Sequence, residues 1–260
     1  MSGLLTGRKA LITGAARGIG EATARRFSEE GAAVAVTDRN GEEAEALAAS
    51  LGPAESPMYA ATLDVTDELA VERVFAEAAD ALGGLDLVVA NAGILTVSPL
   101  SDLSLAAFEE TLRVNVAGVF LTLKHALPHL RAAGGGALLC TTSQAGVHGY
   151  RDMSAYCASK FAIVGIVKSL ADELADEGIR VCAVAPGVTE TAMYDELVRA
   201  RSRLWGIDEA AADERIRRTV PIGRTASPIE VANAFVYLGS SQASYVSGVV
   251  LVLDAAEQSG

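Results

Sequence analysis

The sequence predicts an α/β fold with a parallel sheet and helices on both faces. Three observations support this fold class. Short apolar runs bounded by turn residues alternate with longer helical patterns, and the first run leads directly into the glycine-rich segment TGAARGIG, residues 13–20. No repeat, low-complexity tract or proline-rich linker divides the 260 residues. We therefore expect one domain over residues 1–260, a doubly wound sheet of the Rossmann type.

The expected elements follow the chain in strict alternation. Strands are predicted at the apolar runs KALIT, AAVAVTD, LDLVVANAG, GALLCTTS, IRVCAVAPG and VVLVLD. Helices long enough to be crossovers are predicted at 18–30, 42–51, 67–82, 104–132 and 155–177. The charged stretch 194–218 stands between a strand and the last helix, and we expect a helical lid over about residues 190–220.

Composition favours a small molecule as the partner. The 33 acidic and 21 basic residues give a net charge of −12, which opposes binding to nucleic acid or to an anionic membrane. No apolar run approaches the roughly 18–20 residues of a membrane span, and the start of the sequence does not resemble a signal peptide. We expect a cytoplasmic protein.

Cysteines and histidines give no indication of a metal site. Cys140, Cys157 and Cys182 lack metal-ligand spacing and are expected to be reduced packing residues. His125 and His129 are four residues apart, but they flank Pro128 and no carboxylate or cysteine accompanies them. No metal is predicted.

The segment TGAARGIG has the composition of a loop that holds a dinucleotide. Gly14, Gly18 and Gly20 allow a tight turn, and the helix that begins there offers free N–H groups to a pyrophosphate, with Arg17 and Ile19 in the same loop. The spacing G-x-x-x-G-x-G is a variant of the commoner fingerprint G-x-G-x-x-G. A glycine-rich turn needed only for packing is the alternative.

Asp38 ends the second predicted strand and indicates which cofactor is bound. A carboxylate there accepts hydrogen bonds from both ribose hydroxyls of adenosine and repels a 2′-phosphate, so NAD is favoured over NADP. Arg17 and Arg39 favour NADP, because a guanidinium grips a phosphate. Two further strand ends are expected beside the cofactor, at Asp64-Val65 and at Asn91-Ala92-Gly93, although each alone is an ordinary turn.

The segments TGAARGIG, NAG, NV, YCASK and APG, with Ser143, resemble the short-chain dehydrogenase/reductase family along essentially the whole chain. The resemblance implies a catalytic tetrad of Asn115, Ser143, Tyr156 and Lys160. It also implies that the segment after the sixth strand lies beside the nicotinamide and the phosphates, with Pro186, Gly187, Val188, Thr189 and Thr191 as its cofactor residues. Long helices at 104–132 and 155–177 resemble those that form interfaces in the family, which suggests a homotetramer.

The spacing of Tyr156 and Lys160 suits acid/base chemistry. Residues four apart lie on one face of a helix. A free phenol has a pKa near 10, so we expect the ammonium, together with the positive ring of the oxidised cofactor, to lower it. The resemblance implies that Tyr156 is the acid/base, that Lys160 also holds the nicotinamide ribose, that Ser143 orients the substrate oxygen, and that Asn115 holds a water that connects Lys160 to solvent.

Six residues are expected to line the substrate pocket: Gln144, His148, Tyr150, Met193, Tyr194 and Trp205. The segments SQAG, YCASKF and TAMYDEL are similar to acetoin/2,3-butanediol and polyol dehydrogenases of the family. A glutamine amide and a histidine can bind a second hydroxyl. The expected substrate is an alcohol or ketone, and the sequence favours a small diol, hydroxyketone or polyol.

Alternative functions stay open. One is an NADPH-dependent reductase of 3-oxoacyl thioesters, against which Asp38 and the acidic charge argue, and another is a dehydrogenase of steroids or other bulky alcohols. A nucleotide-binding sensor would have lost a tetrad member, and hydrolysis through Ser143 would need a nucleophile elbow that is absent. The sequence departs from the family at Ala90 and at Ala255-Ala256, where two glycines are usual, which leaves the geometry of the tail in doubt.

Overall fold

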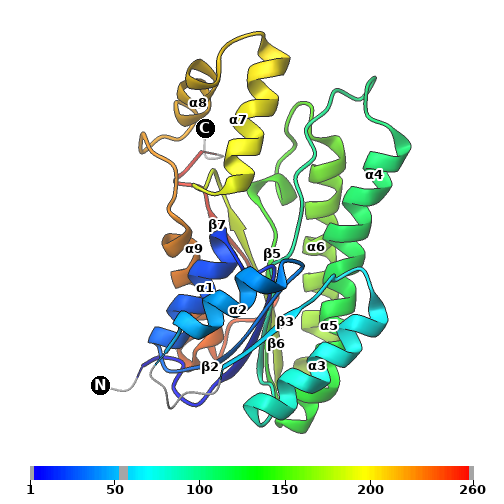
Figure 1. The fold of residues 1–260 in the computed structure, drawn as a ribbon, viewed down its shortest axis with the longest axis vertical. Helices are drawn as coiled ribbons and strands as arrows, with labels where there is room; N and C mark the ends of the chain where they lie inside the picture. Colours follow the sequence, from blue (N-terminus) through cyan, green and yellow to red (C-terminus); the bar gives the residue numbers. More distant parts are fainter. Residues whose placement is uncertain (1–2, 53–57, 258–260) are drawn as a thin grey trace.

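The computed structural model describes residues 3–52 and 58–257, and its sheet is the predicted parallel one (Figure 1). The strand order is β3-β2-β1-β4-β5-β6-β7, and every neighbouring pair is parallel. The strands are β1 (Lys9–Thr13), β2 (Ala33–Asp38), β3 (Met58–Thr62), β4 (Leu87–Ala90), β5 (Gly136–Thr141), β6 (Ile179–Pro186) and β7 (Val250–Leu253). Because β1 pairs with β2 on one side and β4 on the other, the winding reverses at β1 and a crevice opens there.

The helices follow the predicted ranges, with two differences. They are α1 (Gly18–Glu29), α2 (Gly41–Ser50), α3 (Glu68–Leu82), α4 (Leu105–Leu112), α5 (Gly118–Ala132), α6 (Ser154–Glu173), α7 (Ala192–Trp205), α8 (Glu209–Arg217) and α9 (Pro228–Gly239). The helix predicted at 104–132 is interrupted by a π-helical turn, Arg113–Ala117. The helix predicted at 155–177 ends at Glu173, and the chain passes through a short 3₁₀ turn to Gly178 in the left-handed region (φ 68°).

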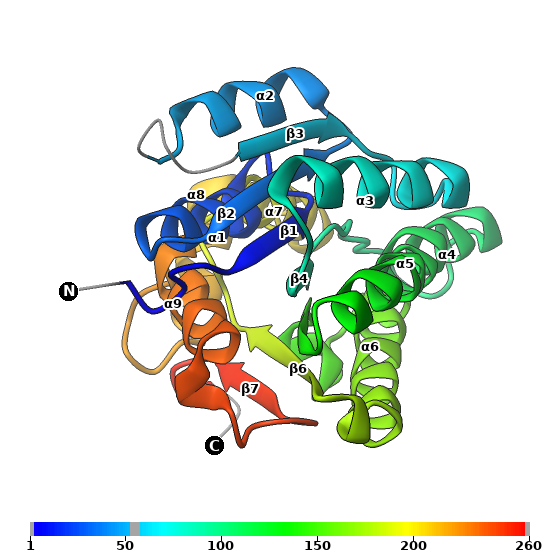
Figure 2. The ribbon, with the colours of Figure 1, turned by 90° about the horizontal axis from the view of Figure 1, so that it is seen from below.

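Alternating side chains of the strands pack into two cores, one on each face of the sheet. In β1, Ala10 and Ile12 pack with residues of α1, α2 and α9, whereas Leu11 packs with residues of α3, α5 and α6. Figure 2 shows the two helical layers on opposite sides of the sheet. Burial on both faces explains why the strands are continuous apolar runs.

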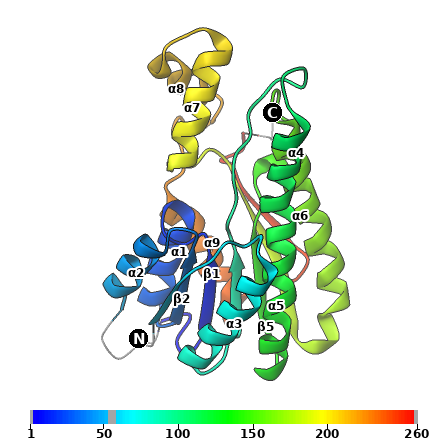
Figure 3. The same ribbon diagram turned by 45° about the vertical axis from the view of Figure 1, so that its right-hand side comes forward.

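The predicted lid is a hairpin of α7 and α8 that projects beyond the rest of the fold (Figure 3). Thr191 caps α7 by accepting a hydrogen bond from the Tyr194 amide at 3.3 Å, and Gly206 ends it in the left-handed region (φ 65°). Val198 and Ile216 pack between the two helices. The hairpin therefore has a small core of its own.

Helix α6 is, among the residues that the structure describes, the one helix as long and apolar as a membrane span, with a mean hydropathy of 1.2. This differs from the expectation that no segment approaches that length. Ile163 and Val167 on its inner face are fully buried in the core beneath the sheet. A core helix passes the same test, so the feature is weak evidence for a membrane.

Candidate active site

A cavity of about 970 Å³ lies at the carboxyl ends of the strands, beneath the lid. The glycine loop, the ends of β2, β4, β5 and β6, the start of α6 and the inner side of α7 all contribute to its wall. It brings together most of the residues predicted from sequence: Gly14, Arg17, Gly18, Ile19, Asp38, Arg39, Asp64, Val65, Asn91, Ala92, Gly93, Ser143, Gln144, Tyr150, Tyr156, Lys160, Pro186, Gly187, Val188, Thr189, Thr191, Met193, Tyr194 and Trp205. Three predicted residues, Gly20, Asn115 and His148, do not line it.

The glycine loop has the shape that close approach of a ligand requires. Gly14 and Gly18 both lie in the left-handed region (φ 61° and 62°), and a Cβ atom on Gly14 would lie 2.7 Å from the Cα atom of Ala92. Asn91 donates hydrogen bonds to the carbonyls of Thr13 and Gly14 at 3.1 and 2.9 Å, which fixes the loop. Asn91 thus supports the loop as well as lining the cavity.

Gly20 has a packing role. A Cβ atom there would lie 2.2 Å from the carbonyl oxygen of Gly14 and 2.7 Å from Nδ2 of Asn91. The third glycine of the fingerprint therefore allows α1 to pack against the loop, and it is not a cavity-lining residue.

Asp38 lines the cavity, and backbone amides hold its carboxylate in place. Its Oδ2 accepts a hydrogen bond from the Ala16 amide at 3.1 Å, and its Oδ1 accepts one from the Asn40 amide at 2.9 Å. Arg17 and Arg39 line the same cavity. The Asp38 carboxylate, which favours NAD, and the Arg17 and Arg39 guanidinium groups, which favour NADP, therefore line the same cavity.

Asp64 is turned toward its own loop. Its Oδ1 accepts hydrogen bonds from the amide and the hydroxyl of Thr66 at 2.9 and 2.7 Å, and these bonds lower the pKa of its carboxyl. The neighbouring Val65 packs close to Gly118, where a Cβ atom would lie 2.6 Å from a methyl group of that valine. The Asp64-Val65 turn therefore presents backbone atoms and apolar side-chain surface to a ligand.

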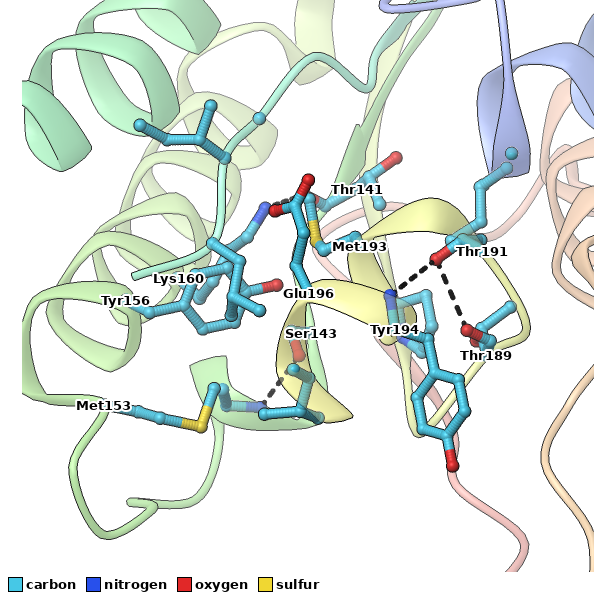
Figure 4. Close-up of a pocket in the computed structure, with 18 of the residues that line it drawn as sticks. Thr141, Ser143, Met153, Tyr156, Lys160, Thr189, Thr191, Met193, Tyr194 and Glu196 are labelled. Atoms are coloured by element: carbon cyan, nitrogen blue, oxygen red, sulfur yellow. Dashed lines mark hydrogen bonds between the residues drawn. The ribbon is translucent and has the colours of Figure 1, made fainter. Parts of the chain in front are cut away.

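Tyr156 and Lys160 lie on the buried face of α6, as their spacing predicts (Figure 4). The Lys160 Nζ atom lies 5.6 Å from the centroid of the Tyr156 ring and donates a hydrogen bond to the carbonyl of Thr141 at 3.1 Å. It also lies 3.6 Å from the position of a Cβ atom on Gly93, so backbone after β4 passes beside the ammonium.

The expected lowering of the Tyr156 pKa depends on the bound cofactor, and in the chain alone this pKa is raised. Burial raises the pKa of Tyr156 to about 12, and a side-chain hydrogen bond with Ser143 opposes this shift only in part. Burial also lowers the pKa of Lys160 to about 8. Burial is the largest cause of both shifts, because desolvation disfavours the charged form of each group.

Ser143 follows β5 and begins a short 3₁₀ turn, Gln144–Gly146. Its Oγ atom accepts a hydrogen bond from the Ala145 amide at 3.1 Å, which leaves its own proton available to donate. The serine and the tyrosine come from different elements, and both line the cavity.

Asn115 lies in the π-helical turn between α4 and α5 and is fully buried. Its Oδ1 accepts from the Ile94 amide at 2.8 Å, and its Nδ2 donates to the Ile94 carbonyl at 2.9 Å and to Ser159 at 3.0 Å. The side chain therefore ties the segment after β4 to α6. One lone pair of Oδ1 is left for a water of the kind that the sequence suggests.

The segment after β6 crosses the cavity beside the glycine loop. Thr189 donates a hydrogen bond to the carbonyl of Gly187 at 3.1 Å. A methyl carbon of Thr191 lies 3.3 Å from the position of a Cβ atom on Gly18. Thr191, at the start of α7, is thus adjacent to the loop predicted to hold the pyrophosphate.

Of the six predicted substrate residues, His148 does not line the cavity, and Tyr194 lines it with its hydroxyl already hydrogen-bonded. The imidazole of His148 is exposed and packs edge-on against Tyr150 at 5.3 Å, because the loop after Gly146 turns outward. Tyr194 lines the cavity, but its hydroxyl donates to Asp213 of α8, so the lid uses it internally. In Figure 4 its ring points away from Tyr156.

Several cavity residues were missed by the sequence interpretation. Glu196, Leu197, Arg201 and Leu204 belong to the inner side of α7, and Glu257 comes from the tail. The α7 residues could have been found from Met193, because residues spaced by three or four positions from it lie on the same face of the helix. No pattern of this kind marks Glu257.

The fold and the site define a dinucleotide-dependent oxidoreductase, and comparison with known proteins agrees. The family model described as short chain dehydrogenase matches residues 8–202. The chain belongs to this family, and its members use nicotinamide cofactors.

Three relatives show the range of related enzymes. D-threitol dehydrogenase of Mycolicibacterium smegmatis is 36% identical, over 96% of this chain and 92% of the relative. Cis-4-hydroxycyclohexanecarboxylate dehydrogenase of Sinomonas cyclohexanicum is 40% identical, over 95% of each chain. The crystal structure of levodione reductase superposes with a TM-score of 0.93 at 31% identity, over 98% of this chain and 99% of the other. The protein is an NAD(P)-dependent alcohol dehydrogenase or ketoreductase.

Proposed function

We propose that this enzyme uses NAD to interconvert a small diol, hydroxyketone or polyol and the corresponding ketone. The proposal rests on one observation above all. Tyr156, Ser143 and Lys160 line the same cavity as the glycine loop and Asp38, and the Lys160 Nζ atom lies 5.6 Å from the centroid of the Tyr156 ring. Such a cavity has room for a dinucleotide and a small alcohol together.

The proposed chemistry is reversible hydride transfer. When bound, the nicotinamide ring supplies the hydride acceptor or donor. Tyr156 takes the proton of the substrate hydroxyl at its phenolic oxygen, and Ser143 donates a hydrogen bond to the same substrate oxygen as charge develops. Since burial holds the phenol protonated, activation of Tyr156 depends on a nearby positive charge. Lys160 and the oxidised cofactor supply that charge together.

Asn115 and Lys160 form the proposed route for the proton. Lys160 gives one N–H to the Thr141 carbonyl and has two more for the ribose and for a water. Asn115 holds the π-helical turn in place through Ile94 and Ser159. Both residues therefore position neighbouring groups and take part in the proposed proton relay.

The preference for NAD rests on Asp38. Its carboxylate is fixed by two backbone amides, so it does not turn away easily from an adenosine ribose. A 2′-phosphate would bring negative charge against it, at a cost that Arg17 and Arg39 would have to offset. Gln144, Tyr150, Met193 and Trp205 are the proposed substrate contacts.

We also propose a homotetramer. The outer faces of α4, α5 and α6 carry exposed apolar side chains, with Leu105 at 70%, Phe120 at 52% and Phe161 at 47% exposure. A second copy of the chain would cover this surface. Sedimentation or native mass spectrometry tests the assembly, and Phe161→Glu should weaken it.

A cytoplasmic location is proposed as well. All three cysteines are free and buried, which suits a reducing compartment.

The test of the function is a panel of alcohols, diols, sugars and steroids incubated with NAD or NADP while nicotinamide absorbance is followed. We expect turnover of small diols or polyols with NAD. Turnover confined to steroids would contradict the proposed substrate class.

A further inference from the structure

The inner side of α7 carries a row of cavity-lining side chains that runs toward the turn between α7 and α8. Leu197, Arg201 and Trp205 are four residues apart, so they share one face of the helix, and all three line the cavity. Leu197 packs against the cluster that contains Met153 and Tyr156. Trp205 is two turns further on, about 12 Å along the helix axis. The cavity therefore extends well beyond the residues that act on the substrate hydroxyl.

The far end of this row holds two guanidinium groups. The Cζ atom of Arg215, on α8, lies 4.2 Å from the centroid of the Trp205 ring, and that of Arg201 lies 5.6 Å from the same centroid. Arg215 also lines the cavity, and it is exposed, so a solute can reach it. Stacking on an indole fixes the plane of a guanidinium and leaves the N–H groups at its edge free to donate.

The two guanidinium groups differ in their partners. Arg201 is buried and pairs with Asp152 at 2.9 Å. Arg215 forms no ion pair and no side-chain hydrogen bond with any residue that the structure describes. On the same helix, by contrast, Arg218 pairs with Glu214. The positive charge of Arg215 is therefore uncompensated at the wall of the cavity.

Two further carboxylates line the cavity, and neither pairs with Arg215. Glu196 is nine residues before Trp205 on α7, which places it about 13 Å back along the helix axis. Glu257 accepts a hydrogen bond from the Thr219 hydroxyl at 2.8 Å through its Oε1. The charge of Arg215 is thus free to bind an anionic group of a ligand.

From these contacts we propose that Arg215, stacked on Trp205, is a subsite for a carboxylate at the end of the substrate remote from the reacting hydroxyl. The inference rests on the proposed hydride transfer and goes beyond the proposed substrate class, which it extends from small neutral compounds to longer hydroxy acids. A planar guanidinium matches the two oxygens of a carboxylate. Met193, Leu197 and Leu204 line the cavity along α7 and offer apolar surface to the carbon chain between the two ends.

The experiment compares secondary hydroxy acids with their amides, which have nearly the same shape and no charge. The series 3-hydroxybutanoate, 5-hydroxyhexanoate, 7-hydroxyoctanoate and 9-hydroxydecanoate places the carboxylate at increasing distance from the hydroxyl. For each acid and its amide, kcat/KM with NAD is measured in the wild type, Arg215→Met and Arg215→Lys, with 2,3-butanediol as the small neutral substrate.

The wild type should prefer the acid to the amide by about tenfold at the longer chain lengths, as a charge-assisted hydrogen bond contributes about that much. Arg215→Met should bring this ratio close to one. Arg215→Lys should retain part of the preference, because lysine keeps the charge but lacks the planar fork.

Binding is also measured without turnover. Trp205 is the single tryptophan of the chain, so its fluorescence reports on this end of the cavity alone. Titration with 9-hydroxydecanoate in the absence of NAD should change the emission of the wild type, and the amide should bind about tenfold more weakly. Salt at 1 M should reduce this difference, because an exposed ion pair is screened.

Arg218→Met is the matched control, because Arg218 is exposed on the same helix and does not line the cavity. It should leave the acid-to-amide ratio at its wild-type value, and a loss equal to that in Arg215→Met would overturn the subsite. Turnover of 2,3-butanediol and the amides, with a ratio near one at every chain length, would overturn the subsite and keep the proposed function. No turnover of any compound, with carboxylate binding that Arg215→Met abolishes, would overturn the proposed function and leave the carboxylate site intact.

Discussion

Arg201 of the lid and Asp152 of the loop before α6 form an ion pair of 2.9 Å, buried between the lid and the catalytic helix. Arg201 also donates to the carbonyl of Arg151 at 2.7 Å. The carbonyl of Asp152 in turn accepts from the Ser98 amide at 2.7 Å. Asp152 is in the left-handed region (φ 61°), which aspartate tolerates better than most residues. The pair thus connects the lid to a loop only four residues before Tyr156.

Arg201→Met should loosen the lid and lower kcat/KM for the alcohol by roughly 10–100-fold, because it leaves the buried Asp152 carboxylate with only the longer ion pair of 3.8 Å to Arg151. Most of the loss is expected in KM, since both residues line the cavity and neither touches the hydroxyl of Tyr156. Steady-state kinetics measures this split.

A double variant separates charge from packing. Arg201→Met with Asp152→Asn removes the unpaired charge and should recover part of the loss. Arg203→Met is the control, because Arg203 is exposed on the same helix and does not line the cavity. Equal losses in the Arg203 and Arg201 variants would contradict the role of the pair.

Tyr156→Phe should lower kcat by about 10²–10⁴-fold, the usual contribution of an acid/base group. The ring stays in place and only the hydroxyl is lost, so affinity for NAD should change little. Stopped assays of turnover and a fluorescence titration with NAD measure the two properties. Tyr245→Phe, at a fully exposed tyrosine, is the control. Retained turnover in Tyr156→Phe would rule out the tyrosine as acid/base.

Lys160 should determine the pH dependence of alcohol oxidation. Burial lowers its pKa to about 8 and raises that of Tyr156 to about 12. The ammonium charge of Lys160 favours the phenolate form of Tyr156, so kcat/KM should rise with pH as the phenol ionises. Without the lysine this charge is lost. Lys160→Met should therefore move the rise upward by more than about one pH unit.

The pH profile of kcat/KM between about pH 6 and pH 10 checks this shift. Lys168→Met, at an exposed lysine further along α6, should leave the profile unchanged. If Lys160→Met and the wild type show the same profile, the lysine does not control the proton.

The sequence alone predicts the sheet and the catalytic face of α6, because both depend on short-range patterns. Buried parallel strands are apolar throughout, and Tyr156 and Lys160 are one helical turn apart. It did not predict the π-helical turn around Asn115. That turn depends on hydrogen bonds to Ile94, a residue distant along the chain.

Left-handed residues other than glycine explain part of what was missed. Asp152, Ala255 and Ala256 all have positive φ, and alanine gives no sign of such a turn. The two alanines where glycines are usual left the tail geometry in doubt. In the structure they adopt the conformation that glycine takes without strain, and so bring Glu257 to the cavity. His148 was misplaced because closeness in sequence to Ser143 does not set the direction of a loop.

Asp38→Asn should shift the cofactor preference toward NADP. The substitution keeps the size of the side chain and one acceptor, so the bond from the Ala16 amide can persist while the charge is lost. Hydrogen bonds from ribose to the carboxylate weaken, and repulsion of a 2′-phosphate near Arg17 and Arg39 disappears. The ratio of kcat/KM for NAD to that for NADP should fall by about 10–100-fold. Asp102→Asn, at an exposed aspartate outside the cavity, should not change it. An unchanged ratio in Asp38→Asn, or a wild-type preference for NADP, would mean that the two arginines govern recognition of the adenosine ribose.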